Sequence, residues 1–332
     1  MMRVVSRLSV VACVLGTASG FFSTLPKVTL PKLELPKTSP KVTAPADFVQ
    51  PEPKPLTATG NFGSLITGSA QLALRLATGI LVEGWSPEFL TEAPEDGAYA
   101  LKLGPLYLKD DSGVLKGEYA RPTKNLVLYE YDASPFSRKV RDACACLDLT
   151  VDMKPCPGAR AGFSDELFEL TGRRTVPYLV DPNSGKGMFE SDDIIAYLYD
   201  TYGPGSDKVP LTLKEPLAVW SCAFAALARS MPASKRQEDA RPDTTEMLPL
   251  TLYGYEASPF VKPVREKLCA MALPHSLINT ARGSANRAKL VKETGVQFQV
   301  PYLKDPNTGI EMFESVEILQ YLDAVYTTEE AE

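Results

Sequence analysis

The chain is poor in the residues that build metal sites and hydrolytic triads. Its 332 residues include one histidine, His275, and six cysteines, none of which form a Cys-x-x-Cys pair. A structural zinc site needs paired cysteine or histidine ligands at short spacing, and a Ser-His-Asp triad needs a histidine beside its nucleophile. The sequence therefore predicts no metal site, and it predicts that His275 is a surface or strand-end residue without a catalytic role.

Positive charge and long apolar runs are also scarce. The 35 lysines and arginines are outnumbered by 41 acids, which gives a net charge of −6. A nucleic-acid partner requires a concentrated positive surface and is not expected. The apolar run 8–16 is too short to cross a bilayer, so no transmembrane span is expected. Gln71 and Arg75 interrupt the apolar stretch 64–83, which we interpret as a buried amphipathic helix, with contact to a membrane surface as the lesser alternative.

The first 59 residues indicate targeting rather than a folded domain. Residues 1–20 combine a basic start, the apolar run and the small residues Ala18-Ser19-Gly20, a pattern typical of signal peptides. Residues 21–59 repeat "LPK" and are rich in proline, so they should stay extended or disordered. Together the two segments resemble the bipartite presequence of algae with secondary plastids. That resemblance implies residence in the plastid (chloroplast), with secretion as the alternative.

One motif occurs twice in the chain. "ASPFSRKVR" at 133–141 returns as "ASPFVKPVR" at 257–265, an offset of 258 − 134 = 124 residues. The same offset separates the two "VPY" motifs and the two "FES" motifs that follow. A repeat that keeps its register over three motifs predicts two copies of one domain.

Each copy has the same expected order of elements. The first has strand-like β-branched and aromatic content before its "ASPF" turn, and Pro135 is placed to open a helix with an apolar stripe. Ser164 and Ser191 are placed to cap two further helices. The pattern predicts the order β-α-β-α-β-β-α, with strands over 126–131, 151–154, 176–180 and 187–190 and helices from Pro135, over 164–171 and from Ser191.

This order, with a proline opening the third strand, resembles the thioredoxin-like fold. The motifs "ASPFSRKVR", "TVPYLVDP" and "FESDDIIAYL", and their second set, resemble the N-terminal domain of glutathione S-transferases and, more distantly, glutaredoxins. The expected fold class is thus α/β, with two tandem thioredoxin-like domains and short helical spacers. The expected divisions are domains at 126–203 and 250–326, a helical or irregular spacer at 60–125, a linker with a short helix at 204–249 and an acidic tail at 327–332.

The resemblance implies a glutathione site in each copy, with glutathione as ligand or co-substrate. The serine before Pro-Phe would donate a hydrogen bond to a bound thiolate at a helix N-terminus. The proline of "VPY" would be cis, with the preceding valine pairing with the ligand backbone, and the Glu-Ser pair would hold the γ-glutamyl ammonium and carboxylate. The implied catalytic residues are Ser134 and Ser258, and the implied binding residues are Phe136, Val176, Pro177, Glu190, Ser191, Phe260, Val300, Pro301, Glu314 and Ser315.

The chain also departs from the transferase pattern. A transferase carries a long all-helical domain after this one, and neither copy is followed by enough residues to build it. A non-catalytic scaffold that binds protein partners therefore stands beside the transferase-like function. A glutaredoxin-like thiol oxidoreductase is disfavoured because serine cannot form a mixed disulfide. Cys144 and Cys146 are interpreted as core thiols. Asp192 and Asp193, where the second copy has Val316 and Glu317, predict unequal affinities for a carboxylate.

Overall fold

The computed structural model describes residues 40–46, 48–53, 73–158 and 160–328. The predicted signal peptide, most of the proline-rich segment, the first part of the 64–83 stretch and the end of the acidic tail lie outside these residues. Within the described part of the chain, no helix has both the length and the apolar character that crossing a membrane requires.

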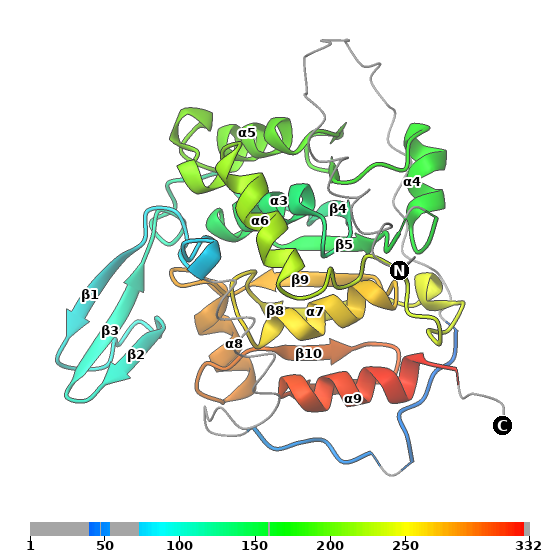
Figure 1. The fold of residues 1–332 in the computed structure, drawn as a ribbon. Helices are drawn as coiled ribbons and strands as arrows, with labels where there is room; N and C mark the ends of the chain where they lie inside the picture. The colour runs from blue at the N-terminus through cyan, green and yellow to red at the C-terminus, as the bar shows by residue number, and fades with distance from the viewer. Residues whose placement is uncertain (1–39, 47, 54–72, 159, 329–332) are drawn as a thin grey trace.

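Both copies of the repeat adopt the expected β-α-β-α-β-β-α order. Buried apolar residues predominate in β4, β6 and β8, and the helices cover the two faces of the sheet (Figure 1). The first copy consists of β4 (Leu126–Glu130), α3 (Pro135–Cys146), β5 (Val151–Pro155), α4 (Ser164–Thr171), β6 (Tyr178–Asp181), β7 (Lys186–Met188) and α5 (Ser191–Tyr202). The second consists of β8 (Leu250–Gly254), α7 (Val261–Ala270), β9 (His275–Asn279), α8 (Asn286–Thr294), β10 (Tyr302–Asp305), β11 (Ile310–Phe313) and α9 (Ser315–Tyr326).

The two copies share one eight-stranded sheet, in the order β11-β10-β8-β9-β5-β4-β6-β7. The edge strands β5 and β9 pair antiparallel, with Asp152 opposite Ser276 at the centre. These two residues are 276 − 152 = 124 positions apart, so each strand pairs with its own counterpart about a pseudo-twofold axis. Ser276 Oγ donates to Asp152 Oδ1 at 2.6 Å across the junction. Pairing the two inner edges leaves neither exposed to other chains.

The spacer before the first copy differs from the expected helical or irregular segment. It contains the antiparallel strands β1 (Ser86–Leu90), β2 (Ala100–Leu103) and β3 (Leu106–Asp111), ordered β1-β3-β2. This small sheet stands at the side of the molecule and is anchored to the second copy, not the first (Figure 1). Asp110 pairs with Arg282 at 2.9 Å, and Ser112 Oγ donates to Gly283 O at 2.7 Å. The strands are short and mostly exposed, so they lack the apolar alternation by which strands are recognised.

The segments that precede the two copies are themselves related. Arg75 pairs with Asp142 on α3 at 2.7 Å, and Arg229, 154 residues later, pairs with Glu266 on α7 at 2.5 Å. Asp142 and Glu266 are separated by the repeat offset of 266 − 142 = 124. Three positive backbone φ angles recur at the offset of 154: 51°, 58° and 81° at Leu76, Ala77 and Gly79, then 60°, 57° and 52° at Ser230, Met231 and Ala233.

The difference between the two offsets locates an insertion. It amounts to 154 − 124 = 30 residues, and the three-stranded sheet occupies the corresponding place between residues 83 and 126. Before the insertion, the N–H of Glu83 donates to Cys146 O at 2.7 Å; in the second copy the N–H of Gln237 donates to Ala270 O at 2.8 Å. Each repeat therefore includes a leader segment, 75–83 or 229–237, that contacts the first helix of its own copy. Of the two copies, the first carries the inserted sheet.

The linker between the copies is partly helical. It holds the 3-10 turns η1 (Ser206–Lys208), η2 (Leu211–Leu213) and η3 (Thr244–Glu246) and the helix α6 (Leu217–Leu227). One face of α6 packs on α3, and Figure 1 shows the helix running outside α3 towards α7.

Candidate functional site

Strand register gathers the predicted binding residues of the first copy at one edge. Tyr178 at the start of β6 lies opposite Tyr129 near the end of β4. On the other side of β6, Leu179 lies opposite Met188 at the end of β7. Continuing this register places Glu190-Ser191 beside Val176-Pro177, next to the turn that follows β4. The Val176–Pro177 bond is cis, as the resemblance implied.

The second copy repeats this arrangement. Tyr302 lies opposite Tyr253 on one side and Phe313 on the other, so Glu314-Ser315 lies beside Val300-Pro301. The Val300–Pro301 bond is also cis. A third cis bond, Glu215–Pro216, precedes α6 and was not predicted. Among the described residues, no hydrogen bond involves the backbone of Val176 or Val300.

The acid of each Glu-Ser pair has a strained backbone. Glu190 has φ 63° and ψ 110°, and Glu314 has φ 73° and ψ 114°. Residues other than glycine rarely adopt positive φ, and such strain persists where the surrounding structure or a function requires it. The same outlier at the same place in both copies marks this corner as a candidate ligand site.

The helices that begin at these corners lack side-chain caps. We expected Ser191 to be an N-cap; instead the N-cap position is Glu190, and Ser191 is the first helical residue, because the positive φ turns the chain one residue earlier. Glu314 and Ser315 take the same two positions in α9. Neither helix has a side-chain hydrogen bond at its N-cap. The N–H groups of each first turn are therefore placed to bind an anion.

The strain at these corners gives a testable order of stabilities. We expect the free energy of unfolding of Glu190→Gly to be about 1 kcal/mol higher than that of Glu190→Ala, because glycine adopts this positive φ without strain and alanine does not. The same order is expected at Glu314. Urea denaturation of the four variants measures it. The exposed helical position Glu169 is the control, since alanine there should be the more stable of the two. If the alanine variant is as stable as the glycine variant at both corners, the backbone at Glu190 and Glu314 is not strained.

The structure places Ser134 at the N-cap of α3 and Ser258 in the turn before α7, two residues ahead of the N-cap Phe260. Ser134 Oγ accepts from the N–H of Ser137 at 3.2 Å, and Ser258 Oγ accepts from the N–H of Val261 at 3.3 Å. Their exposed fractions are 2% and 1%. Phe136 is exposed, whereas Phe260 is half-buried at the start of α7. The catalytic role of the serines stays a prediction, and the contacts that they make are those of N-caps.

A buried lysine changes the electrostatics of the first corner. Lys139 on α3 is fully buried, and its Nζ lies 2.5 Å from Asp192 and 3.0 Å from Glu215. The equivalent of Lys139 in the second copy is Pro263, and the equivalent of Asp192 is Val316. The charged pair is thus replaced as a unit. The predicted repulsion of a carboxylate by Asp192 is weakened by Lys139, which the sequence argument did not include.

The turns of the two copies meet in a cluster of buried charges. Arg141 contacts Glu256 of the other copy at 2.9 Å, and its counterpart Arg265 contacts Asp132 at 2.8 Å. Lys262 lies 3.3 Å from Asp132, and Arg138 lies 3.6 Å from Glu256. These contacts are related by the pseudo-twofold axis. Sequence analysis missed them, although both repeated motifs carry an acid two residues before the serine and an arginine seven residues after it.

Burial and charge compete within this cluster. Burial alone would raise the pKa of Asp132, but Arg265, Lys262 and Arg141 outweigh it and hold the pKa far below its usual range. Burial raises the pKa of Glu130 despite the neighbouring Arg141. Burial also lowers the pKa of Arg265 to about 10. The cluster stays stable only while the opposite charges remain paired.

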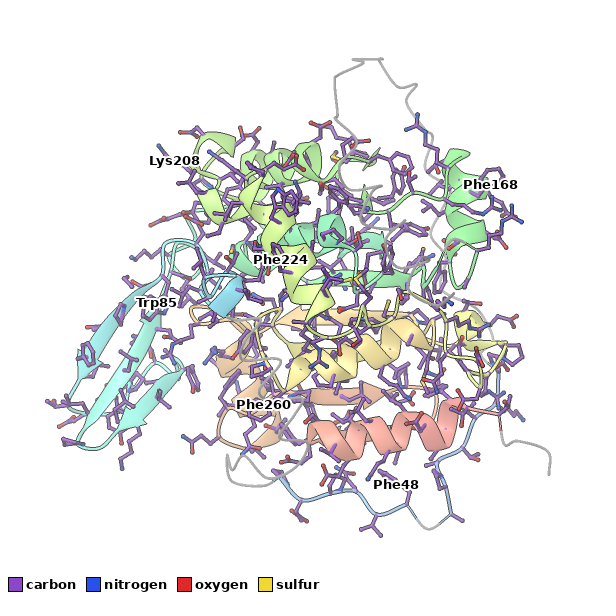
Figure 2. All side chains as sticks on the ribbon, viewed as in Figure 1. Phe48, Trp85, Phe168, Lys208, Phe224 and Phe260 are labelled. Carbon is purple, nitrogen blue, oxygen red and sulfur yellow. The ribbon has the colours of Figure 1, made fainter. Side chains whose placement is uncertain are left out.

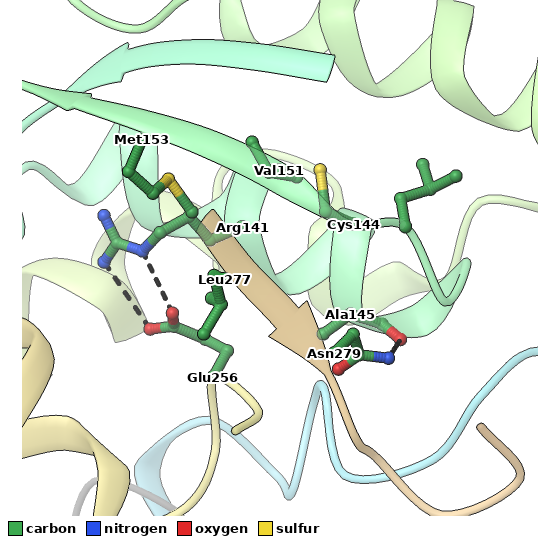
Figure 3. Close-up of a pocket in the computed structure, with 9 residues that line it drawn as sticks. Arg141, Cys144, Ala145, Val151, Met153, Glu256, Leu277 and Asn279 are labelled. Atoms are coloured by element: carbon green, nitrogen blue, oxygen red, sulfur yellow. Dashed lines mark hydrogen bonds and ion pairs between the residues drawn. The ribbon is translucent and has the colours of Figure 1, made fainter. Parts of the chain in front are cut away.

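Among the described residues, the junction holds no disulfide and no cluster of metal ligands. A small cavity beside the Arg141–Glu256 pair is lined mainly by apolar residues of α3, β5 and β9 (Figure 3). Cys144 faces it, and burial raises the pKa of this thiol to about 12. Cys146 has the same pKa for the same reason, so both cysteines are core thiols, as expected. Across the described parts of the chain, no three His, Cys, Asp or Glu side chains gather as metal ligands would.

The comparison with protein families agrees with this architecture. The element order and the two cis prolines define the fold of each copy as thioredoxin-like. More particularly, the family model for the N-terminal domain of glutathione S-transferases matches residues 128–206 and again residues 252–330. The chain therefore carries two glutathione S-transferase N-terminal domains in tandem, and the predicted family and fold class are confirmed.

Among solved structures, a chain of TDR1, described as a unique trimeric glutathione transferase of Leishmania, is similar to this one with 16% identity and a TM-score of 0.24. The match covers 63% of this chain and 68% of that one. No curated protein matches the sequence.

Proposed function

We propose that the chain binds glutathione at the corners formed by Val176 with Glu190-Ser191 and by Val300 with Glu314-Ser315. The observation that carries this proposal is the strained glutamate before an uncapped helix, which occurs in both copies. Strain that is kept twice at the same place indicates that the geometry serves a ligand. The match to the transferase family model supports glutathione as that ligand.

Each part of glutathione has a chemical counterpart at these corners. The unpaired backbone of Val176 can pair with the peptide backbone of the ligand as an added strand does. The first-turn N–H groups of α5, with Ser191, suit the γ-glutamyl α-carboxylate. The carboxylate of Glu190, exposed at the corner, suits the ammonium group beside it. Val300, Glu314 and Ser315 would act in the same way in the second copy.

The burial of the two serines favours binding without turnover. A serine that activates a thiol must reach the bound sulfur, and Ser134 and Ser258 are both covered and each already accepts a backbone N–H at its Oγ. No long helical domain separates the copies to form a pocket for an electrophile. A binding module is therefore the function that we favour, and transferase activity is the second candidate.

Calorimetric titration of the full chain with millimolar reduced glutathione tests the proposal. We expect a binding heat that the double variant Glu190→Ala/Glu314→Ala loses, because the ammonium partner is removed from both corners. Glu88→Ala on the exposed strand β1 is the matched control and should bind like the parent chain. An absence of heat with the parent chain contradicts glutathione binding. Steady conjugation of an electrophile that is lost in Ser134→Ala/Ser258→Ala would instead establish the transferase candidate.

A further inference from the structure

The outer face of α6 exposes a stripe of large apolar side chains. Leu217, Trp220, Phe224 and Leu227 have exposed fractions of 47%, 45%, 55% and 53%. The opposite face of the helix, with Ala218, Cys222 and Ala225, is buried, and α6 packs on α3. Figure 2 shows Phe224 on the outside of the molecule. An exposed row of this kind marks an interaction surface, because single-chain proteins seldom leave large apolar side chains adjacent to one another in water.

The stripe is symmetric in both spacing and chemistry. Its positions are separated by three, four and three residues, and its side chains read leucine, aromatic, aromatic, leucine from either end. The rings of Trp220 and Phe224 stack, with their centroids 6.2 Å apart. An antiparallel second copy of α6, related by a twofold axis near Cys222, would place Leu217 against Leu227 and Trp220 against Phe224. A surface that complements itself under a twofold rotation is the requirement for an isologous dimer.

We propose that this stripe is the contact between two copies of the chain, with the two α6 helices packed antiparallel. The area is appropriate for the core of such a contact. A covered aromatic side chain buries about 150–250 Å², so four half-exposed side chains contribute roughly 400 Å² per copy, about half of a standard interface. Leu211, 75% exposed on the 3-10 turn before α6, adds to the apolar surface next to the stripe.

The charges around the stripe favour a second copy over a lipid surface. Helices that lie on membranes carry lysine and arginine along their polar face, whereas α6 contains no charged residue and its other face is buried. The exposed charges shortly before the helix balance one another, with Asp207 and Glu215 next to Lys208 and Lys214, so no basic patch flanks the stripe. An antiparallel pair also brings the N-terminus of each helix towards the C-terminus of its partner, which is the favourable arrangement of helix dipoles.

Disulfide trapping of the full chain tests both the contact and its direction. In the variant Leu217→Cys/Leu227→Cys, the two new thiols of one chain lie about 15 Å apart along the helix and cannot bond to each other. In the antiparallel dimer, position 217 of one chain lies against position 227 of its partner. Oxidation should therefore produce a covalent dimer on non-reducing gels. Leu217→Cys alone should form no covalent dimer and should run as a single chain on the same gel. The five native cysteines of the described residues are buried and are not expected to interfere.

A second measurement uses no cysteine. In sedimentation velocity from low to high micromolar concentration, the parent chain should dimerise, and Trp220→Glu/Phe224→Glu should raise the dissociation constant at least tenfold. Phe89→Glu, at an exposed phenylalanine on β1, is the control and should dimerise like the parent. A parent chain that stays monomeric throughout overturns the proposal. So does crosslinking of Leu217→Cys alone, which indicates a parallel contact, and so does a monomer that binds lipid vesicles through the stripe.

Discussion

Replacing Glu256 with alanine is expected to lower the free energy of unfolding by about 3–5 kcal/mol. The Glu256 carboxylate lies between Arg141 and Arg265 and is 1% exposed. Its removal leaves two buried guanidinium groups with fewer partners, and burial already lowers the pKa of Arg265 to about 10. Uncompensated buried charge is among the largest single costs in a folded protein. Chemical denaturation followed by circular dichroism measures the loss.

The matched control for this variant is Glu293→Ala in the same copy. Glu293 pairs with Lys304 at the surface, where its side chain is 44% exposed. A surface pair of this kind contributes at most about 1 kcal/mol. If Glu256→Ala costs no more than Glu293→Ala, the buried charge cluster does not depend on Glu256 to stay paired.

The single histidine predicts a steep loss of stability in mild acid. His275 begins β9 and is fully buried. Its Nδ1 lies 3.0 Å from Leu273 O, and its Nε2 has no hydrogen-bond partner among the described residues. Burial, the largest cause, lowers its pKa from 6.5 to about 4. Between these values the unfolded chain binds the proton and the folded chain does not. The stability that the neutral ring contributes is therefore complete above pH 6.5 and falls by about 3 kcal/mol as the pH approaches 4.

The variant His275→Leu isolates this effect. It removes the titrating ring at every pH, so the difference in unfolding free energy between parent and variant should change by about 3 kcal/mol from pH 7 to pH 4. Acids whose pKa is raised by burial, such as Glu130 and Asp148, act in the opposite direction. Because both proteins contain them, they cancel in the difference. A difference that stays constant over this range contradicts a neutral buried His275.

Repeated motifs allowed the domain core, and the corners at which we propose a ligand, to be located from the sequence. Strand and helix periodicity identified β4 to α5, and the "VPY" and "FES" motifs identified the edge where Val176 and Glu190 meet. The burial of Ser134 and Ser258 was beyond such reasoning, because it depends on what packs over each turn. That is decided by the pairing of β5 with β9, a contact between distant parts of the chain that leaves no local signal.

Two other features required coordinates for the same reason. The segments before the two copies show only a shared Ala/Leu character in the sequence, and the equivalence of Arg75 and Arg229 follows from the positive φ angles and from the pairs with Asp142 and Glu266. The compensation of Asp192 by Lys139 joins two helices that are 53 residues apart in the chain. A sequence shows each of these residues, but their distances follow from the packing of the helices.

The pairing of β5 with β9 also bears on how such a protein could arise and persist. A strand that pairs with its own counterpart about a twofold axis would serve equally well between two separate single-copy chains. Fusing the two in one chain makes their association intramolecular, so dilution no longer separates them and the two domains are always present in a ratio of one to one. Once the partners are inherited together, each is free to change alone. The Lys139 and Asp192 pair in one half, and Pro263 and Val316 in the other, are a divergence of this kind.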